Sequence, residues 1–175
     1  GCGDVCSRLA TQLLAGGWEV HGLRRNVSRL PEGVVGVAGD LFNKDCPATW
    51  PVGAVDYVVY CAAATDHDEA GYRAAYVQGL QHVLEWLDDY GQVPNRLLFV
   101  SSSSVYGQQQ GEWIDETSPA VAAGYSGRVM LEAEQIALNS DIPASIVRLT
   151  GIYGPGREWL LTQVRRGYRV AIDPP

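Results

Sequence analysis

The residues best suited to chemistry are a run of serines and a tyrosine near the middle of the chain. The segment FVSSSSVYG, residues 99–107, places a run of hydroxyl groups directly after an apolar stretch. The segment AGYSGRVMLEAEQ, residues 123–135, places Tyr125 at the start of a helical pattern. A strand-end hydroxyl can hold a substrate oxygen while a tyrosine transfers a proton to or from it. Without supporting signals, however, a serine run after a strand is more often simply a loop.

The first six residues, GCGDVC, have the spacing of a phosphate-binding turn. Glycines at positions 1 and 3 match the first two glycines of G-x-G-x-x-G, whereas Cys6 takes the place of the third. Such a turn brings the backbone close to a pyrophosphate at the N-terminus of a helix. Gly1, Gly3, Asp4 and Val5 are therefore predicted to bind a dinucleotide.

Two arginines stand at the position that distinguishes the two nicotinamide dinucleotides. An acidic residue about 20 positions after the glycine turn accepts hydrogen bonds from the 2′-hydroxyl of NAD. Arg24 and Arg25 stand there instead, and guanidinium groups pair with the 2′-phosphate of NADP. The sequence predicts NADP in preference to NAD, although two solvated arginines at a strand end would look the same. Asp40 and Leu41, in the segment GDL, follow the next strand, where Asp40 can accept a hydrogen bond from the adenine amino group.

The elements that must position these residues follow an alternating order. Short β-branched runs alternate with longer amphipathic stretches, which predicts an α/β fold with a doubly wound parallel sheet covered by helices on both faces. Strands are expected at 18–23, 33–38, 55–64, 96–102 and 144–150, and helices at 5–15, 68–90, 124–139 and from 158.

The order of these motifs resembles that of the extended short-chain dehydrogenase/reductase family, the NAD-dependent epimerase/dehydratase group. That resemblance implies a Rossmann core followed by a variable substrate region. It also implies an NAD(P)-dependent oxidoreductase or epimerase that acts on a hydroxylated, sugar-like small molecule. The features that carry it are the glycine turn, GDL at 39–41, CAAA at 61–64, SSSSVYG at 101–107, WIDETSP at 113–119, the Tyr125 helix and RLTGIYGPG at 148–156.

The resemblance assigns further site residues. The family's catalytic serine or threonine lies three positions before the valine of VYG, which is Ser102. The small residues Ala62, Ala63 and Ala64 would leave room for a flat dinucleotide, although a tight contact between helix and sheet needs the same residues. Gly151 stands where many sugar-nucleotide enzymes of the family carry an asparagine, which argues against a nucleotide-diphosphate sugar as substrate.

The chain departs from the family at the lysine of Tyr-x-x-x-Lys. That lysine contacts the nicotinamide ribose and lowers the phenol pKa, whereas Val129, at the same position, can do neither. Arg128 is the nearest cation, close to Tyr125 on the helix surface, and is predicted to be a substitute. Alternatively, Arg128 is solvated, and the protein is a catalytically silent NADP-binding or redox-sensing protein.

Residues 1–175 read as one dinucleotide-binding domain that lacks parts at both ends. A doubly wound nucleotide fold starts with a buried strand that leads into the glycine turn, and this chain starts at the turn itself. We therefore expect the first strand and the C-terminal substrate region to be missing from these residues.

Composition narrows the set of partners. A formal net charge of −7 and a pI near 4.8 argue against nucleic acid or an anionic membrane as partner, and leave a small-molecule substrate. The four cysteines form no CxxC pair, so free thiols are expected and no metal site. No apolar run approaches the ~20 residues that cross a bilayer. We expect a cytoplasmic protein, with a homodimer left open.

Overall fold

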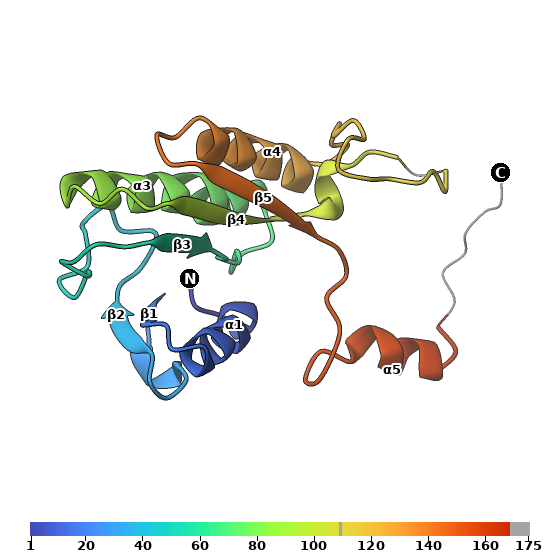
Figure 1. The fold of residues 1–175 in the computed structure, drawn as a ribbon. Helices are drawn as coiled ribbons and strands as arrows, with labels where there is room; N and C mark the ends of the chain where they lie inside the picture. Colours follow the sequence, from blue (N-terminus) through green and yellow to red (C-terminus); the bar gives the residue numbers. More distant parts are fainter. Residues whose placement is uncertain (109, 169–175) are drawn as a thin grey trace.

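The computed structural model describes residues 1–108 and 110–168, which form helices and parallel strands (Figure 1). The elements in chain order are α1 Asp4–Ala15, β1 His21–Arg24, the 3-10 turn η1 Val27–Arg29, β2 Val35–Ala38, β3 Tyr57–Tyr60, α2 Glu69–Tyr72, the π-helical segment η2 Arg73–Gln78, α3 Gly79–Asp89, β4 Arg96–Ser102, the 3-10 turn η3 Ser103–Val105, α4 Tyr125–Leu138, β5 Ala144–Leu149 and α5 Trp159–Arg165.

The strands form two parallel sheets instead of one. β1 pairs with β2, and β3, β4 and β5 pair in that order, with β4 in the centre. The predicted α/β class with parallel strands is confirmed. Among residues 1–108 and 110–168, no strand pairs with both sheets.

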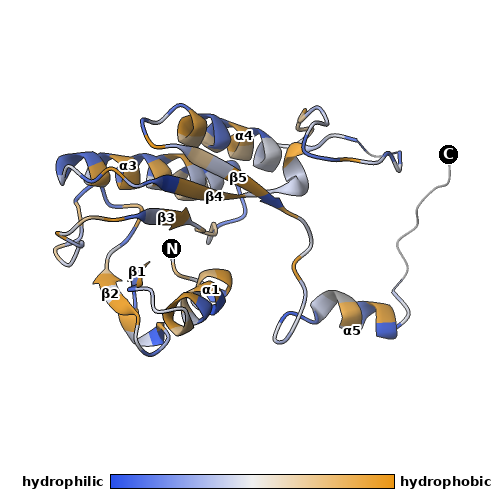
Figure 2. Ribbon diagram, viewed as in Figure 1, coloured by the Kyte–Doolittle hydropathy of each residue, from blue (hydrophilic) through white to orange (hydrophobic). Residues whose placement is uncertain are grey.

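The larger sheet carries the hydrophobic core. Burial alternates along β4, so that Leu97 and Phe99 are fully buried. Side chains of α3 and α4 pack against them, among them Leu80, Trp86 and Ala133. Figure 2 shows the corresponding amphipathic character of these two helices, which carry hydrophobic and hydrophilic residues on different faces. The core therefore fixes β4 and α4, the two elements that carry the predicted catalytic residues.

A glycine on α4 brings this helix against the serine run. A Cβ atom built on Gly127 would overlap the carbonyl oxygen of Ser104. Because glycine has no Cβ, the first turn of α4 packs directly on the backbone of η3. Tyr125 and the end of β4 are consequently held at the same edge of the sheet.

The long helical region after β3 begins at a side-chain cap and contains an irregular segment. Asp68 caps α2 by accepting a hydrogen bond from the Gly71 N–H at 2.7 Å. The single helix predicted at 68–90 is observed as α2, η2 and α3, because the middle segment has π-type hydrogen bonding. In the described part of the chain, no helix is long and apolar enough to cross a membrane.

Candidate functional site

Most of the predicted cofactor residues line one cleft of about 210 Å³. The glycine turn forms one wall, the ends of β1 and β2 form another, and the segment after β3 forms the third. Asp4, Val5 and Ala64 lie next to this cleft in sequence without lining it. The predicted residues in its lining are Gly1, Gly3, Arg24, Arg25, Asp40, Leu41, Ala62 and Ala63.

The first turn of α1 is open toward the cleft. Gly3 is the N-cap residue, and no side chain caps the helix there. A Cβ atom built on Gly3 would meet nothing within 4 Å, whereas one built on Gly1 would lie 3.8 Å from the Cα of Ala62. A helix of 12 residues with a free N-terminal turn attracts anions through its N–H groups and its dipole. The residues present therefore fit a dinucleotide whose pyrophosphate lies at this turn.

The two arginines have different surroundings. Arg24 donates from Nη1 to the carbonyl oxygen of Cys2 at 3.0 Å, so it ties β1 to the glycine turn. Arg25 is 63% exposed, and its Nη1 lies 4.0 Å from Oδ2 of Asp40. Arg25 is therefore the more exposed of the two guanidinium groups at the edge of the cleft, while Arg24 holds the glycine turn.

The predicted catalytic residues lie at the carboxyl end of β4 and the start of α4, but they are engaged elsewhere. Ser102 accepts a hydrogen bond from the Ser104 N–H at 3.2 Å. The Tyr125 hydroxyl donates to the carbonyl oxygen of His67 at 2.5 Å. Arg128 is exposed and donates to the carbonyl oxygen of Ala123 at 3.3 Å, just before its own helix. The Tyr125 hydroxyl would have to leave the His67 carbonyl to donate its proton to a substrate, whereas the Ser102 hydroxyl still has its own proton to donate.

Val129 is part of the hydrophobic core. Its side chain is 1% exposed and packs in the cluster that contains Val105 and Met130. The position where the family pattern has a lysine is therefore inaccessible to solvent in this protein. Sequence reasoning identified the missing cation but not this burial.

Two thiols beside the cleft were not identified as a pair from the sequence. Cys6 lies on α1 and Cys61 directly follows β3, and both are free. The neighbouring Cys6 thiol is the main cause that lowers the pKa of Cys61 to about 7, and Arg157 lowers it further. The proximity of Cys61, together with burial, raises the pKa of Cys6. Of these two thiols, Cys61 therefore ionises first.

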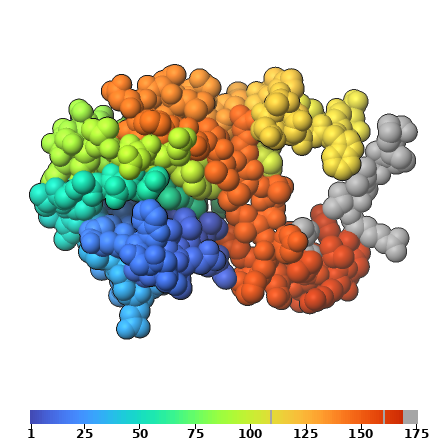
Figure 3. Space-filling model, viewed as in Figure 1, coloured from blue at the N-terminus to red at the C-terminus, as the bar shows by residue number. Residues whose placement is uncertain are grey.

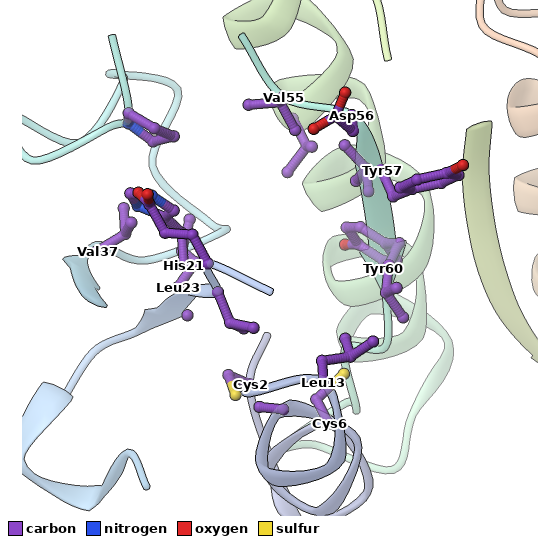
Figure 4. A pocket seen from close by; sticks show the side chains of 18 of the residues that line it. Cys2, Cys6, Leu13, His21, Leu23, Val37, Val55, Asp56, Tyr57 and Tyr60 are labelled. Carbon is purple, nitrogen blue, oxygen red and sulfur yellow. The ribbon is translucent and has the colours of Figure 1, made fainter. Parts of the chain in front are cut away.

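A second, larger cavity separates the two sheets. It has a volume of about 390 Å³ and is bounded by α1, β1 and β3. Figure 4 shows Cys6 and Leu13 of α1, His21 and Leu23 of β1, and Tyr57 and Tyr60 on β3, all around this space. Cys6 therefore faces the cavity between α1, β1 and β3.

The loop after β5 is attached to the glycine turn. Arg157 donates from Nε to Oδ2 of Asp4 at 2.8 Å, and Arg8 donates to the carbonyl oxygen of Pro155 at 2.8 Å. The Arg157 guanidinium is the main cause that lowers the pKa of Asp4. Figure 3 shows the segment that leads to α5 in contact with the N-terminal region. Within residues 1–108 and 110–168, no group of His, Cys, Asp and Glu could hold a metal ion.

A glycine turn and strand ends that meet around one cleft, on parallel strands covered by helices, define a Rossmann-type nucleotide-binding protein. The sequence profile of the NAD-dependent epimerase/dehydratase family matches residues 1–168. The chain belongs to the NAD-dependent epimerase/dehydratase family, as the resemblance in its motifs implies.

Solved structures of similar fold are longer than this chain. One is a protein of Methylobacillus flagellatus that is described as a proposed NAD-dependent epimerase/dehydratase. It is 36% identical to this chain with a TM-score of 0.74, and the match covers 97% of this chain and 59% of that one. A UDP-galactose 4-epimerase has a TM-score of 0.71 at 19% identity, with 97% and 62% covered. Bordetella bronchiseptica WbmG, solved with NAD and UDP, has a TM-score of 0.70 at 23% identity, with 97% and 58% covered. The last two show the fold alone.

A curated relative shares part of the sequence. Protein YeeZ of Escherichia coli K12 is 39% identical over 83 residues, which are 47% of this chain and 29% of YeeZ. The chain thus spans less than two thirds of each of these relatives.

Proposed function

We propose that this chain forms the dinucleotide-binding part of an NADP-dependent oxidoreductase or epimerase that acts on a hydroxylated, sugar-like small molecule. The observation that carries this proposal is the cleft at the N-terminus of α1, where the glycine turn, Arg25 and the alanines after β3 face one space. NAD-bound relatives such as WbmG support nicotinamide binding by this family. Arg25, exposed beside the cleft, is the feature that favours NADP.

The chemistry would divide between cofactor and chain. The nicotinamide supplies or accepts hydride when bound. Tyr125 would exchange a proton with the substrate hydroxyl or carbonyl, and Ser102 would hold the same oxygen. Arg128 would approach Tyr125 only after it leaves the carbonyl of Ala123.

The first test separates binding from turnover. NADPH and NADH titrations by intrinsic fluorescence should show tighter binding of NADPH, and equal affinities would contradict the NADP preference. An NADPH-oxidation screen over aldoses, ketoses and simple carbonyl compounds should then find a substrate. A Tyr125→Phe variant should lose at least about 100-fold in turnover, because general acid–base assistance contributes that much.

A second candidate function is supported by Val129 and Tyr125. The lysine position is occupied by a core residue, and the Tyr125 hydroxyl is bound to the His67 carbonyl. Both observations favour a protein that binds NADP without catalysis and acts as a dinucleotide or redox sensor. Tight NADPH binding together with no turnover in the screen would select this candidate.

A further inference from the structure

Glu134, on the inner face of α4, is an acidic side chain inside the core. Its side chain is 2% exposed, and it is the one acidic residue in the described part of the chain that is fully buried. A buried carboxylate is costly unless charged and hydrogen-bonded partners surround it. Glu134 Oε1 accepts from Ser101 Oγ at 2.6 Å and from Arg148 Nε at 3.0 Å, and its Oε2 accepts from Arg148 Nη2 at 2.7 Å. One carboxylate therefore joins α4, β4 and β5.

Arg148 extends this network toward the surface. Its Nη1 donates to the Tyr106 hydroxyl at 2.9 Å, and its Cζ lies 5.1 Å from the centre of the Tyr106 ring. The Tyr106 hydroxyl in turn donates to the carbonyl oxygen of Asp115 at 3.0 Å. A continuous chain of hydrogen bonds thus runs from the end of β4 to the segment 110–120.

The ends of this network are the groups that the proposed reaction needs. Ser101 directly precedes Ser102, and α4 begins at Tyr125. We propose that Glu134 is a positioning residue whose buried carboxylate fixes the serine run against α4 and, through Arg148 and Tyr106, fixes the segment around Asp115. This inference rests on the proposed function, because Ser102 and Tyr125 are the residues that are positioned.

Core stability alone does not require the directed hydrogen bonds of this network. A well-packed apolar pair of similar volume often replaces a buried ion pair without loss of stability. An apolar pair, however, makes no directed bonds to Ser101 and Tyr106. Stability and positioning can therefore be separated by substitution.

The same helix provides a matched control. Glu132 forms a bidentate pair with Arg73 at 2.6 and 2.7 Å, and these side chains are 41% and 43% exposed. The Glu132–Arg73 pair has similar geometry to the Glu134–Arg148 pair but is far more exposed, and it makes no hydrogen bond to the serine run or to Tyr106. A Glu132→Gln variant should therefore behave like the parent protein.

The experiment compares Glu134→Gln, Glu132→Gln and the double variant Glu134→Leu/Arg148→Met in the protein with NADPH and the substrate from the screen. Glu134→Gln should lower kcat about 100-fold, because small misplacements of reacting groups have effects of that size, with the NADPH Kd changed less than 2-fold. Hydrogen exchange should rise in residues 101–106 and 110–120. The double variant should regain the parent Tm without regaining kcat.

A milder variant keeps the test decisive if Glu134→Gln does not fold. Tyr106→Phe removes only the oxygen between Arg148 and Asp115, so hydrogen exchange should rise in residues 110–120 alone. The proposal is overturned by Glu134→Gln with parent kcat and parent exchange, or by a double variant that regains kcat together with Tm. It is overturned as well if Tyr106→Phe leaves exchange in 110–120 unchanged. If the parent turns over no substrate, the catalytic proposal fails, and exchange in residues 101–120 alone decides the positioning role.

Discussion

The two sheets of this protein differ in how well their interiors are filled. Around β3, β4 and β5 the side chains form one buried cluster, in which Leu97 and Phe99 have no exposed surface. Around β1 and β2, the buried hydrophobic side chains among the described residues are Cys2, Ala10 and Val37. A cavity of about 390 Å³ lies between the two sheets.

This difference in packing separates the two tasks that we propose for the protein, cofactor binding and catalysis. The candidate catalytic hydroxyls lie on elements that the filled core holds in place. The glycine turn and both arginines lie on the side that borders the cavity. Cofactor affinity should therefore depend on the less filled region, and catalytic geometry on the filled one.

The largest effect is expected from a charge placed in the filled region. Val129→Lys restores the family motif but puts an amine at a position that is 1% exposed. Burial lowers a lysine pKa by up to about 3–5 units, and each unit corresponds to about 1.36 kcal/mol. We expect a loss of roughly 4 kcal/mol or more in the free energy of unfolding at pH 7.

The pH dependence of this loss has a definite sign. The lysine pKa is lower in the folded than in the unfolded protein, so the unfolded state binds more protons at neutral pH. The loss should therefore shrink as the pH rises from 7 toward about 10, which urea unfolding at several pH values will show. Val129→Met is the uncharged control. A loss that does not change with pH would mean that the amine reaches water or the cleft.

The difference in packing between the two regions can be tested by replacing one leucine with alanine in each region. Leu97→Ala removes a fully buried side chain from the filled core and should cost about 3 kcal/mol. Leu13→Ala removes a half-buried side chain that already borders the cavity, and should cost about 1 kcal/mol. Denaturant midpoints with unchanged m-values will measure both losses. Equal losses would show that the cavity is filled when the protein is folded in solution.

In the less filled region, the two arginines should give different binding defects. Arg25→Ala should weaken NADPH binding about 10-fold and leave NADH unchanged, since an exposed charge-assisted contact to phosphate is lost. Arg24→Ala should weaken both dinucleotides, because Arg24 holds the Cys2 carbonyl of the glycine turn. Fluorescence titrations with both cofactors will separate these outcomes. Equal loss of NADH and NADPH in Arg25→Ala would remove Arg25 from phosphate recognition.

The smallest effect concerns thiol reactivity. Alkylation requires the thiolate, so the iodoacetamide rate at Cys61 should rise with pH through about 7. Burial raises the pKa of Cys46, which should react only at higher pH. A lower pKa also lowers nucleophilicity, so we expect Cys61 to react only several-fold faster at pH 7. Peptide mass spectrometry will give both rates, and saturating NADPH should protect Cys61 alone. Equal rates for both thiols would contradict the lowered pKa of Cys61.

Local sequence patterns were sufficient for most of the fold. The run RLLFVSS predicts β4 with the bounds that the structure has, Arg96–Ser102, because a central strand is apolar along its length. The helix expected at 5–15 is α1, which ends before Gly16 and Gly17. Spacing was also enough to predict residues that lie together, because most of those proposed for cofactor binding line one cleft at the strand ends.

Tertiary contacts explain what the sequence could not show. Glu134 and Val129 are both helical residues in an amphipathic pattern, and nothing local distinguishes a carboxylate that will be buried against Arg148 from a more exposed one such as Glu132. The proximity of Cys6 to Cys61 likewise brings together residues 55 positions apart. The engagement of Tyr125 by the His67 carbonyl depends on a loop conformation that no periodicity encodes.

The π-helical segment η2 also has a consequence for comparing this chain with its relatives residue by residue. A π-type hydrogen bond encloses one more residue than an α-type bond. Ala75, inside η2, and Leu80, just after it, are five positions apart, and both are buried. A relative whose helix is regular here would present the same buried face with one residue fewer. An alignment with such a relative should therefore place a single-residue gap between Ala75 and Leu80. If α3 is aligned correctly and no gap is allowed, every position of α2 is matched to the wrong residue of the relative.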